Sequence, residues 1–472
     1  MKGYLRQLAS ESAVYGLASI GSRFLSVLLV PLYTRLFAPE EFGTLSLVTT
    51  TVTLLSILVV LGLDNSAYRW FWDTEVTDER KRTMASWAWC QLTVSAVVGV
   101  ILAAAAGPLS RLLSQPAEAA GLYRLLAFTL PLGAVVAVAS GMLRLQRRPI
   151  AAASYGLGTA VVGAALTVLL AWWQEMGLTG VCLAQVLAQG CGAVVGAVLL
   201  RDWIAPRWFD RPRLLAMLRY ALPLVPAAIA QWLLGFANRY TLEWTAGSRE
   251  VGLFALASSI AMLLAIITAG FQQAWAPFAL SIHQRPEARQ VYGAVLALYV
   301  WLAGTAAAFL GVFAPEALAW FTTPGYAAAT DAVGLLALAV AIGGCTTIAV
   351  IGPNIVKDNR PTALSVGYGA VLNVLLGVLM VPAWGIVGAA VAAVIAQLVA
   401  TTYLFWRAQR VYPIPYRFGY ALLVLAVVST TVILATAIDG VIGRAALLLA
   451  PIALVPRGAL RRLMELGAPR PG

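Results

Sequence analysis

Charged residues, cysteine and histidine are all scarce in this sequence of 472 residues. Only 11% of the residues are Asp, Glu, Lys or Arg, and the chain has four cysteines and one histidine. The cysteines lie inside apolar segments and form no Cys-x-x-Cys or Cys/His pair, so the sequence indicates neither a disulfide framework nor a metal site. We therefore expect no metal and no cofactor. An enzyme is not expected either, because acid–base chemistry needs carboxylates or histidine near the reacting group, and the predicted outer loops are short and poor in both.

Long polar stretches are missing as well, so no separate soluble domain is predicted. Of all residues, 61% are apolar, which is more than a soluble protein of this length can bury. Runs of about 20 mostly apolar residues, enough to cross a hydrocarbon core about 30 Å thick, recur along the whole chain. The predicted fold class is therefore an all-α polytopic membrane protein of about 14 transmembrane helices. The predicted spans are 13–35, 43–63, 84–106, 121–143, 150–173, 178–200, 219–242, 250–274, 290–313, 331–354, 361–382, 385–406, 418–437 and 440–456.

The positive charges alternate along the chain in a way that predicts the orientation. With the N-terminus in the cytoplasm, 25 Lys and Arg residues fall in cytoplasmic segments and 6 fall in outer segments. This distribution follows the positive-inside rule and predicts that both termini are cytoplasmic. The same rule accounts for the net charge of +12. Nucleic-acid binding is not expected, because no basic run is interleaved with exposed aromatic residues.

The two halves of the chain resemble each other at a spacing of about 209 residues. EFGTLSLVTTTVTLLSI (41–57) matches EVGLFALASSIAMLLAI (250–266), and GLTGVCLAQVLAQ (177–189) matches GIVGAAVAAVIAQ (385–397). A general likeness among apolar helices is the alternative explanation, but matching loop prolines and Gly-x-x-Gly starts favour a parallel repeat of six spans plus six. Such repeats commonly place the substrate between the halves. The predicted domains are an N-terminal lobe (1–200), a cytoplasmic linker (201–218), a C-terminal lobe (219–408), and two extra helices with a cytoplasmic tail (409–472).

Segments from both halves carry a family pattern. In the first half they are YGLASIGSRFLSVLLVPLYTRLFAPEEFGTLSLV (15–48) and LGLDNSAYRWF (61–71). In the second half they are YALPLVPAAIAQWLLGFANRYTL (220–242), VGLFALASSIAML (251–263), AWAPF (274–278), and the stretch from Lys357 through Pro361, Asn373 and Pro382 to GIVGAA (385–390). With these segments the chain resembles the bacterial oligosaccharide flippases, whose superfamily also contains multidrug and toxin extruders and the lipid II flippase.

The resemblance implies two helical bundles around a central cavity, alternating access, and export of undecaprenyl-diphosphate-linked glycans across the bacterial inner membrane. The implied partners are a lipid-linked anionic oligosaccharide, membrane lipids and polysaccharide assembly proteins. One departure limits the comparison. Many relatives carry Asp-Arg where this chain has Asn238-Arg239, so a role of that acid is not transferred.

Arg23 is the strongest candidate for a contact with the substrate. It lies near the middle of the first predicted span, where a charge costs at least about 2.5–3.5 kcal/mol on insertion scales, so it should face a cavity or a partner. Ser19 and Ser26 would form a small polar stripe with it on one helix face. A guanidinium can donate two hydrogen bonds at once to a diphosphate. The alternatives are a structural ion pair with Asp64 or Glu11, or a side chain that reaches back to the interface.

A second polar series lies in the seventh predicted span. Gln231, Asn238 and Arg239 follow Pro223 and Pro226, and prolines near a helix start can bend the helix and serve as a gate or hinge. The two prolines can equally mark the start of the helix. Arg239 is expected near the outer end of this span, where it would either contact the substrate or anchor the helix at the interface.

The predicted cytoplasmic gate consists of residues at the inner ends of two equivalent spans. Asp64 aligns through the repeat with Gln273, which follows Gln272, and Arg69 lies in the same predicted cytoplasmic region as Asp64. A helix cap is the alternative role for Asp64. Asn373, inside the eleventh span, is predicted either to contact the substrate or to bond a neighbouring helix.

The predicted function is a flippase that moves an undecaprenyl-diphosphate-linked oligosaccharide from the cytoplasmic to the outer leaflet. A multidrug or toxin extruder is an alternative, although no acidic residue within a bundle is evident. A membrane glycan polymerase or ligase and a scaffold that has lost transport are others. No carboxylate lies securely at mid-membrane and His283 falls in a predicted cytoplasmic loop, so a proton relay is poorly supported. The membrane potential, negative inside, would favour outward movement of an anion.

Overall fold

The structure is a computed structural model that describes residues 16, 18, 21, 22, 24, 25 and 27–461. Within these residues every regular element is a helix, and no strand is present. The helices divide into two compact units, Met1–Trp232 (unit 1) and Leu233–Gly472 (unit 2). The boundary between the units falls inside helix α11.

Helix bounds in unit 1 follow chain order. They are α2 (Val30–Leu36), α3 (Pro39–Val60), α4 (Leu63–Trp72), α5 (Thr77–Leu112), α6 (Ala119–Ala127), α7 (Thr129–Leu145), α8 (Pro149–Thr167), η1 (Val168–Trp173), α9 (Gly177–Leu200), η2 (Pro206–Trp208), α10 (Arg211–Ala221), η3 (Leu222–Leu224) and α11 (Val225–Ala246), which continues into unit 2.

The remaining helices belong to unit 2. They are α12 (Ser248–Ile282), α13 (Ala288–Val312), α14 (Ala314–Phe321), η4 (Pro324–Ala329), α15 (Thr330–Ala349), α16 (Ile351–Ile355), α17 (Arg360–Val411), α18 (Phe418–Ala437), α19 (Val441–Leu447) and α20 (Leu449–Ala453).

The prediction of an all-α polytopic membrane protein is confirmed. In the described part of the chain, 11 helical stretches are long and apolar enough to cross a membrane. One of them, α17 with 52 residues, contains a kink at Gly385 (φ 52°, ψ −131°), and the sequence predicted two spans there. The first predicted span, 13–35, lies largely outside the described residues. The last one, 440–456, corresponds to the apolar stretch Val441–Ala453, which is shorter than the roughly 20 residues that a span needs.

Helices in unit 1 begin at recognisable signals. Pro39 and Pro149 occupy the first turns of α3 and α8, where the missing N–H of proline costs nothing. The Glu41 carboxylate accepts the backbone N–H of Ala38 at 2.9 Å and so closes the start of α3. Asp210 caps α10 by accepting the N–H of Arg213 at 3.0 Å.

Equivalent glycines in the two halves have equivalent backbone roles. Gly177 and Gly385 both have positive φ, 59° and 52°, which glycine adopts without steric cost. A Cβ at Gly180 would lie 2.9 Å from the Leu170 carbonyl oxygen, and one at Gly388 would lie 2.4 Å from that of Met380. The geometry therefore agrees with the alignment of the two halves.

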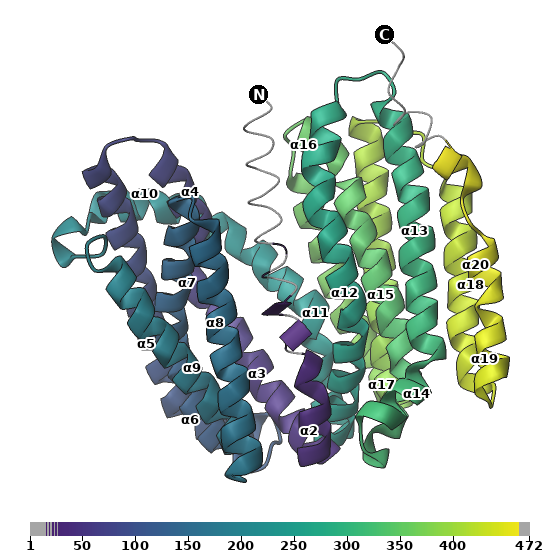
Figure 1. Cartoon of the computed structure of the whole chain (residues 1–472), viewed down its shortest axis with the longest axis horizontal. Helices are drawn as coiled ribbons and strands as arrows, with labels where there is room; N and C mark the ends of the chain where they lie inside the picture. Colours follow the sequence, from purple (N-terminus) through teal and green to yellow (C-terminus); the bar gives the residue numbers. More distant parts are fainter. Residues whose placement is uncertain (1–15, 17, 19–20, 23, 26, 462–472) are drawn as a thin grey trace. The chain divides into compact units, whose positions relative to one another are not determined.

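Unit 1 is held together by packing of its long helices against α9 and α5. α9 packs on α7 and α8, whereas α5 packs on α6 and α7, and Figure 1 shows α5, α7, α8 and α9 running side by side. α10 packs on α4 and on one part of α5. The core there includes Phe71, Met84, Trp87, Met142 and Met217, all nearly fully buried. These contacts fix the wall of the cavity described below.

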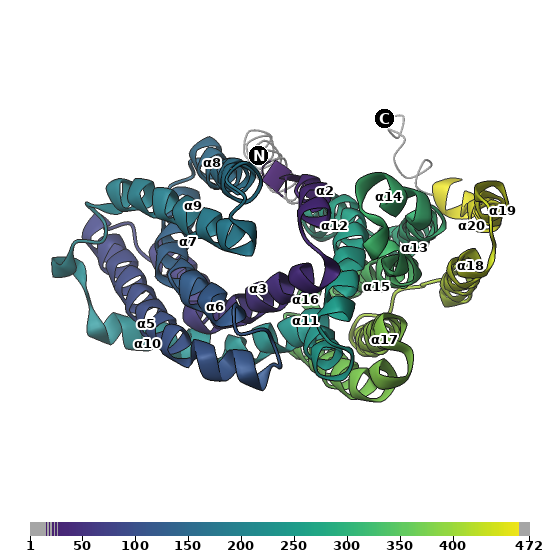
Figure 2. The same cartoon turned by 90° about the horizontal axis from the view of Figure 1, so that it is seen from below.

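Unit 2 is built around α15. This helix packs on α12, α13 and α17, and the views of Figures 1 and 2 both place α18, α19 and α20 beside α13 at the edge of the unit. Small residues let the helices approach closely, as is common in membranes. A Cβ at Gly311 would lie 3.0 Å from the Cα of Gly334, and one at Gly304 would lie 3.2 Å from the Val428 side chain.

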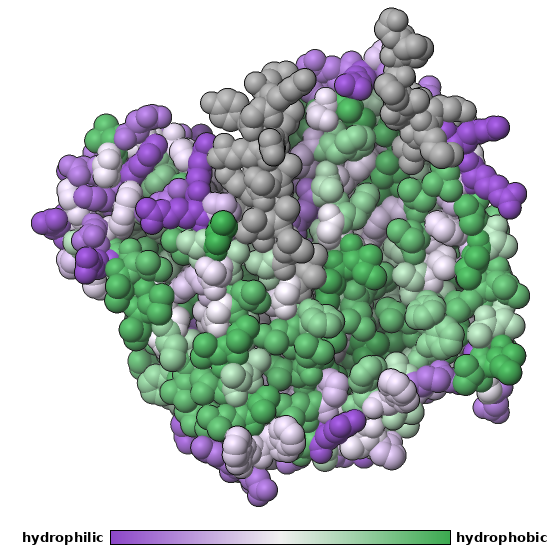
Figure 3. Space-filling model, viewed as in Figure 1, coloured by the Kyte–Doolittle hydropathy of each residue, from purple (hydrophilic) through white to green (hydrophobic). Residues whose placement is uncertain are grey.

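The outer surface of the helices is suited to a bilayer. On the face that Figure 3 shows, hydrophobic residues cover the middle of the helices and hydrophilic residues gather toward their ends. Large apolar side chains such as Val100, Ile150 and Leu379 are exposed. Exposed apolar surface of this extent is covered by a partner or a membrane, and the span lengths indicate the membrane.

Candidate functional site

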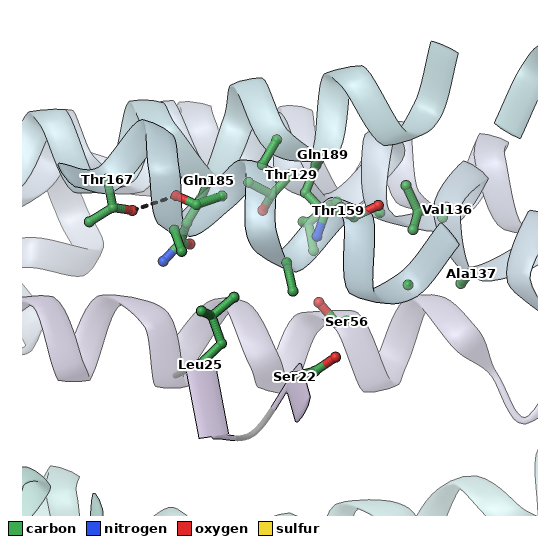
Figure 4. A pocket seen from close by; sticks show the side chains of 18 of the residues that line it. Ser22, Leu25, Ser56, Thr129, Val136, Ala137, Thr159, Thr167, Gln185 and Gln189 are labelled. Carbon is green, nitrogen blue, oxygen red and sulfur yellow. Dashed lines mark hydrogen bonds between the residues drawn. The ribbon is translucent and has the colours of Figure 1, made fainter. Parts of the chain in front are cut away.

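Unit 1 encloses a cavity of about 650 Å³ among its membrane-spanning helices. Its wall comes from α2, α3, α5, α7, α8 and α9 and from residues that precede α2. The lining residues are Ser22, Leu25, Leu29, Tyr33, Ser56, Val59, Val60, Gln91, Thr129, Leu130, Gly133, Ala134, Val136, Ala137, Gly156, Thr159, Ala160, Gly163, Ala164, Thr167, Gln185, Ala188 and Gln189. In Figure 4, Ser22, Leu25 and Ser56 lie on one side of this space, across from Thr159, Gln185 and Gln189. We call this space the unit 1 cavity.

Three glutamines line the unit 1 cavity. Gln91 on α5 is only 2% exposed, and its side-chain carbonyl oxygen has no hydrogen-bond partner among the described residues. The carbonyl oxygen of Gln189 on α9 is likewise buried and without a partner in the described part of the chain. Gln185 lies one turn before Gln189, so both are on the same face of α9. A buried carbonyl without a partner calls for a hydrogen-bond donor.

Hydroxyl groups line the cavity between the glutamines. Ser56 donates to the Val52 carbonyl at 2.9 Å, Thr159 to that of Tyr155 at 2.9 Å, and Thr167 to that of Gly163 at 2.8 Å. Because each hydroxyl has one proton, the oxygens of Ser56 and Thr159 keep the capacity to accept a hydrogen bond, whereas the Thr167 hydroxyl also bonds the Tyr33 hydroxyl. The three glutamines also carry side-chain N–H groups, so the polar wall contains both donors and acceptors, and its buried groups without a described partner are the carbonyl oxygens of Gln91 and Gln189.

No Asp, Glu, Lys, Arg or His is among the described residues that line the unit 1 cavity. The amide and hydroxyl groups present there can form hydrogen bonds with a ligand. Small residues leave room for a ligand, since a Cβ at Gly156 would meet no atom within 4 Å.

Three of the predicted substrate-binding residues, Ser19, Arg23 and Ser26, lie outside the described residues. Their roles stay predictions. Ser22, from the same stretch, lines the unit 1 cavity and donates its hydroxyl to the Ala18 carbonyl at 3.0 Å.

The structure brings Asn238 and Asn373 together. The Asn238 amide donates to the Asn373 side-chain oxygen at 3.1 Å and to the Ala389 carbonyl at 2.9 Å, and the Asn373 amide donates to the Leu234 carbonyl at 3.1 Å. Both asparagines are nearly fully buried. This network joins α11 to both parts of α17, which corresponds to the helix-bonding alternative for Asn373. A substrate contact of either residue stays a prediction.

The other predicted residues of the seventh span lie in η3 and α11. Pro223 lies in η3 and Pro226 in the first turn of α11, so they mark the junction of two helices. Gln231 is exposed. The guanidinium of Arg239 lies 5.0 Å from the centre of the Phe236 ring, a cation–π distance.

The predicted gate residues are divided between the two units: Asp64 and Arg69 belong to unit 1, and Gln272 and Gln273 belong to unit 2. Asp64 lies in the first turn of α4, where its carboxylate accepts the Asn65 amide at 3.3 Å. The Arg69 guanidinium lies 5.1 Å from the centre of the Tyr220 ring. Gln272 and Gln273 are exposed residues of α12. Their role as a gate stays a prediction.

Sequence analysis missed the polar wall of the unit 1 cavity. The sequence pattern does not identify Gln91 or Gln185 as site residues, and Gln189 appears in it only as part of the aligned repeat segment 177–189. Glutamines inside otherwise apolar spans are a usable signal, because polar residues within membranes usually face a cavity or a partner.

Unit 2 has a cavity of different character, with a volume of about 570 Å³. It lies among α13, α15, α17 and α18, and we call it the unit 2 cavity. Its lining residues are Leu296, Val300, Ile342, Cys345, Leu398, Thr401, Thr402, Phe405, Trp406, Gln409, Arg410, Phe418, Ala421, Leu422 and Leu425. The Arg410 guanidinium lies 3.9 Å from the centre of the Trp406 ring. The remainder of the wall is mostly apolar and aromatic.

Comparison with known sequences gives two matches. The family model described as "Polysaccharide biosynthesis protein" matches residues 8–283, which is more than half of the chain. The succinoglycan biosynthesis transport protein ExoT of Rhizobium meliloti (strain 1021) is 26% identical over 365 residues, a match that covers 75% of this chain and 69% of ExoT.

Comparison with solved structures indicates the fold. The lipid II flippase MurJ in an inward closed conformation matches with a TM-score of 0.74 at 10% identity, covering 94% of this chain and 97% of MurJ. A multidrug resistance MATE family transporter in an inward-facing conformation matches with a TM-score of 0.68 at 18% identity, covering 84% of this chain and 94% of the transporter. At these identities the likeness concerns the fold alone.

Proposed function

Because the chain belongs to the polysaccharide biosynthesis protein family, we propose that it flips an undecaprenyl-diphosphate-linked oligosaccharide from the cytoplasmic to the outer leaflet by alternating access. The family predicted from the resemblance is confirmed by the match over residues 8–283. The apolar helices of the described chain and the family together make it a multi-pass transporter of the inner membrane.

The observation that carries this proposal is the unit 1 cavity, which offers uncharged polar groups inside membrane-spanning helices. The substrate has a hydrocarbon tail that is stable in the bilayer and a polar head that is not. Moving the head through hydrocarbon without hydrogen bonds would be prohibitively costly. Glutamine and hydroxyl side chains at membrane depth lower this cost by replacing hydrogen bonds to water.

We propose that Arg23 binds the diphosphate, while the polar residues of the unit 1 cavity form hydrogen bonds with the sugar. The proposal for Arg23 rests on its place near the middle of the first predicted span. A cation there would offset the charge of the diphosphate and could form two hydrogen bonds to it. The membrane potential would then favour outward movement by about 2.3 kcal/mol per charge for every 100 mV.

The test uses a strain that lacks the native gene and measures surface polysaccharide together with lipid-linked oligosaccharide on the cytoplasmic side. We expect the unmodified gene to restore export and Arg23→Ala to abolish it, with partial recovery by Arg23→Lys. Arg111→Ala is the matched control, because Arg111 is exposed near the end of α5. Normal export by Arg23→Ala at normal protein level would contradict the proposed site.

The same strain separates the proposed function from its alternatives. A strain that keeps its polysaccharide but becomes susceptible to cationic drugs would identify an extruder. A strain that flips the lipid-linked oligosaccharide but cannot join the repeating units would identify a polymerase. In vesicles, dissipating the potential at a constant pH gradient should slow transport, and an unchanged rate would exclude the potential as the energy source.

A further inference from the structure

Building on the proposed flipping of a lipid-linked oligosaccharide, we propose that the unit 1 cavity is a sugar subsite. It recognises the hydroxyl donors of an uncharged sugar unit through the carbonyl oxygens of Gln91 and Gln189. The diphosphate is bound outside this wall. The sugar and the diphosphate of the head group thus occupy two chemically different sites.

The inventory of polar groups points to a ligand that donates hydrogen bonds. Two buried carbonyl oxygens, those of Gln91 and Gln189, have no partner among the residues that the structure describes. The hydroxyls of Ser56, Thr159 and Thr167 already donate to their own helices. A sugar hydroxyl supplies the missing donor, and an acetamido N–H does so equally well.

The same inventory argues against an anion at this wall. Phosphate oxygens only accept hydrogen bonds, so they cannot supply the donor that the carbonyl oxygens of Gln91 and Gln189 lack among the described residues. No described lining residue carries a positive charge. An anion transferred from water to such a wall would lose its hydration without a compensating charge.

The size of the cavity argues for an organic ligand. Its volume of about 650 Å³ lies within the range of about 300–1,000 Å³ typical of small-molecule sites. A bare metal cation needs several oxygens converging at about 2.4 Å. The two carbonyl oxygens without a described partner belong to residues on two helices, α5 and α9, and a sugar ring with several hydroxyls can donate to both.

The repeat shows that this wall is particular to unit 1. Gln189 aligns with Gln397, and a Cβ added at Gly343 would lie 3.3 Å from the Gln397 side chain. Gln185, one turn earlier, aligns with Ala393. The second part of α17 in unit 2 therefore has one glutamine, Gln397, in the aligned segment. The aligned helix α9 in unit 1 has two glutamines on the same helix face.

Binding to the purified full-length protein in nanodiscs tests the subsite with two probes. One probe is lipid-linked oligosaccharide extracted from cells that make it, and the other is undecaprenyl diphosphate, which has no sugar. The variant Gln91→Leu/Gln189→Leu removes both acceptors at nearly constant volume. We expect it to weaken binding of the sugar-bearing lipid by about tenfold or more, and to leave undecaprenyl diphosphate unaffected.

A second pair of variants tests the cavity without changing its glutamines. Gly156→Leu should project into the cavity, whereas Gly158→Leu lies on the same helix away from it, and a Cβ meets no atom within 4 Å at either position. We expect only Gly156→Leu to weaken binding of the sugar-bearing lipid. Equal weakening by both leucine variants would contradict the subsite.

The outcomes separate the subsite from the proposed function. If the unmodified protein binds no lipid-linked oligosaccharide, the proposed function fails and the subsite fails with it. If it binds and the glutamine variant binds equally well, only the subsite is contradicted. Equal weakening of both probes would place the diphosphate in the cavity, and stabilisation by Na⁺ over K⁺ that the glutamine variant abolishes would identify a cation site. Both results would overturn the inference.

Discussion

The two units of this protein have cavities that differ in the polar residues they contain. Unit 1 lines its cavity with glutamine, serine and threonine, whereas the unit 2 cavity is mostly apolar and aromatic, with Arg410 against Trp406. The glycines at the start of each sixth helix are retained in both halves. Under the predicted repeat, the difference indicates that close packing constrains the aligned glycines, whereas side chains that face open space can diverge.

A second difference lies in the second helix of each half. In unit 1 the helix is broken at Leu61 and Gly62, which have φ values of 51° and 67° between α3 and α4. The equivalent helix in unit 2, α12, continues through Gly270 to Ile282. Of these two aligned helices, only the one in unit 1 is therefore broken at this position.

The largest effect is expected for the glycines that the halves share. Gly388→Ala would place a Cβ 2.4 Å from the Met380 carbonyl oxygen, so the backbone must move, at a cost of more than about 3 kcal/mol. Gly180→Ala should cost less, because its closest contacts are at 2.9 Å. Thermal unfolding in detergent measures both. Gly121→Ala, where a Cβ meets nothing within 4 Å, is the control, and three equal melting temperatures would refute the shared constraint.

The next effect concerns the asparagine pair, which has no equivalent in α8 of unit 1. Asn373→Ala and Asn238→Ala should each lower stability by about 1–3 kcal/mol, because each leaves buried polar groups without a partner. The double variant should cost less than the sum of the two. Chemical denaturation gives the coupling. Normal stability with lost transport would instead support the substrate contacts predicted from the sequence.

A smaller effect on transport should distinguish the two cavities. In cells, Gln91→Leu/Gln189→Leu is expected to reduce export by about tenfold, because two acceptors for the sugar are lost. Thr401→Val in the unit 2 cavity removes a hydroxyl that donates to the Ile342 carbonyl at 3.4 Å, and it should reduce export by less than about twofold. Equal losses at matched protein level would mean that both cavities contribute alike.

The smallest effect is expected from the helix break. Gly62→Ala forces a side chain into positive φ at a cost of about 1–2 kcal/mol. Gly270→Ala lies within regular helix with no atom within 4 Å of the new Cβ, so it should gain about 0.5–1 kcal/mol. Opposite shifts in melting temperature would support the asymmetry, and shifts of the same sign would contradict it.

The fold could be predicted from the sequence because the bilayer imposes a length on every span. Predicted spans such as 121–143, 178–200 and 418–437 fall within Ala119–Leu145, α9 and α18. The predicted spans 361–382 and 385–406 correspond to the two parts of α17 on either side of the kink at Gly385, where φ is 52° and ψ is −131°. The short length of the last predicted span, 440–456, could not be predicted from hydropathy, because α19 and α20 end after only a few residues each.

The candidate site was harder to predict than the fold. Gln91 and Gln185 are isolated polar residues, and a hydropathy pattern does not tell which helix face looks into a cavity. Asn373 was recognised as polar within a span, but its partner Asn238 lies 135 positions earlier, so only the packing of α11 against α17 brings them together. The prediction for Arg23 rests on the cost of placing a charge inside a membrane span.

A wall whose buried groups without a described partner accept hydrogen bonds has a consequence for the range of cargo. Every hydroxyl of a sugar can donate whatever its axial or equatorial setting, and the serine and threonine side chains around Gln91 and Gln189 can rotate to meet it. If sugars bind there as proposed, we expect the cavity to tolerate epimers and to exclude glycans whose hydroxyls are methylated or acetylated. Chemical capping of the cargo, rather than a change in its stereochemistry, is then the modification that should stop it at the membrane.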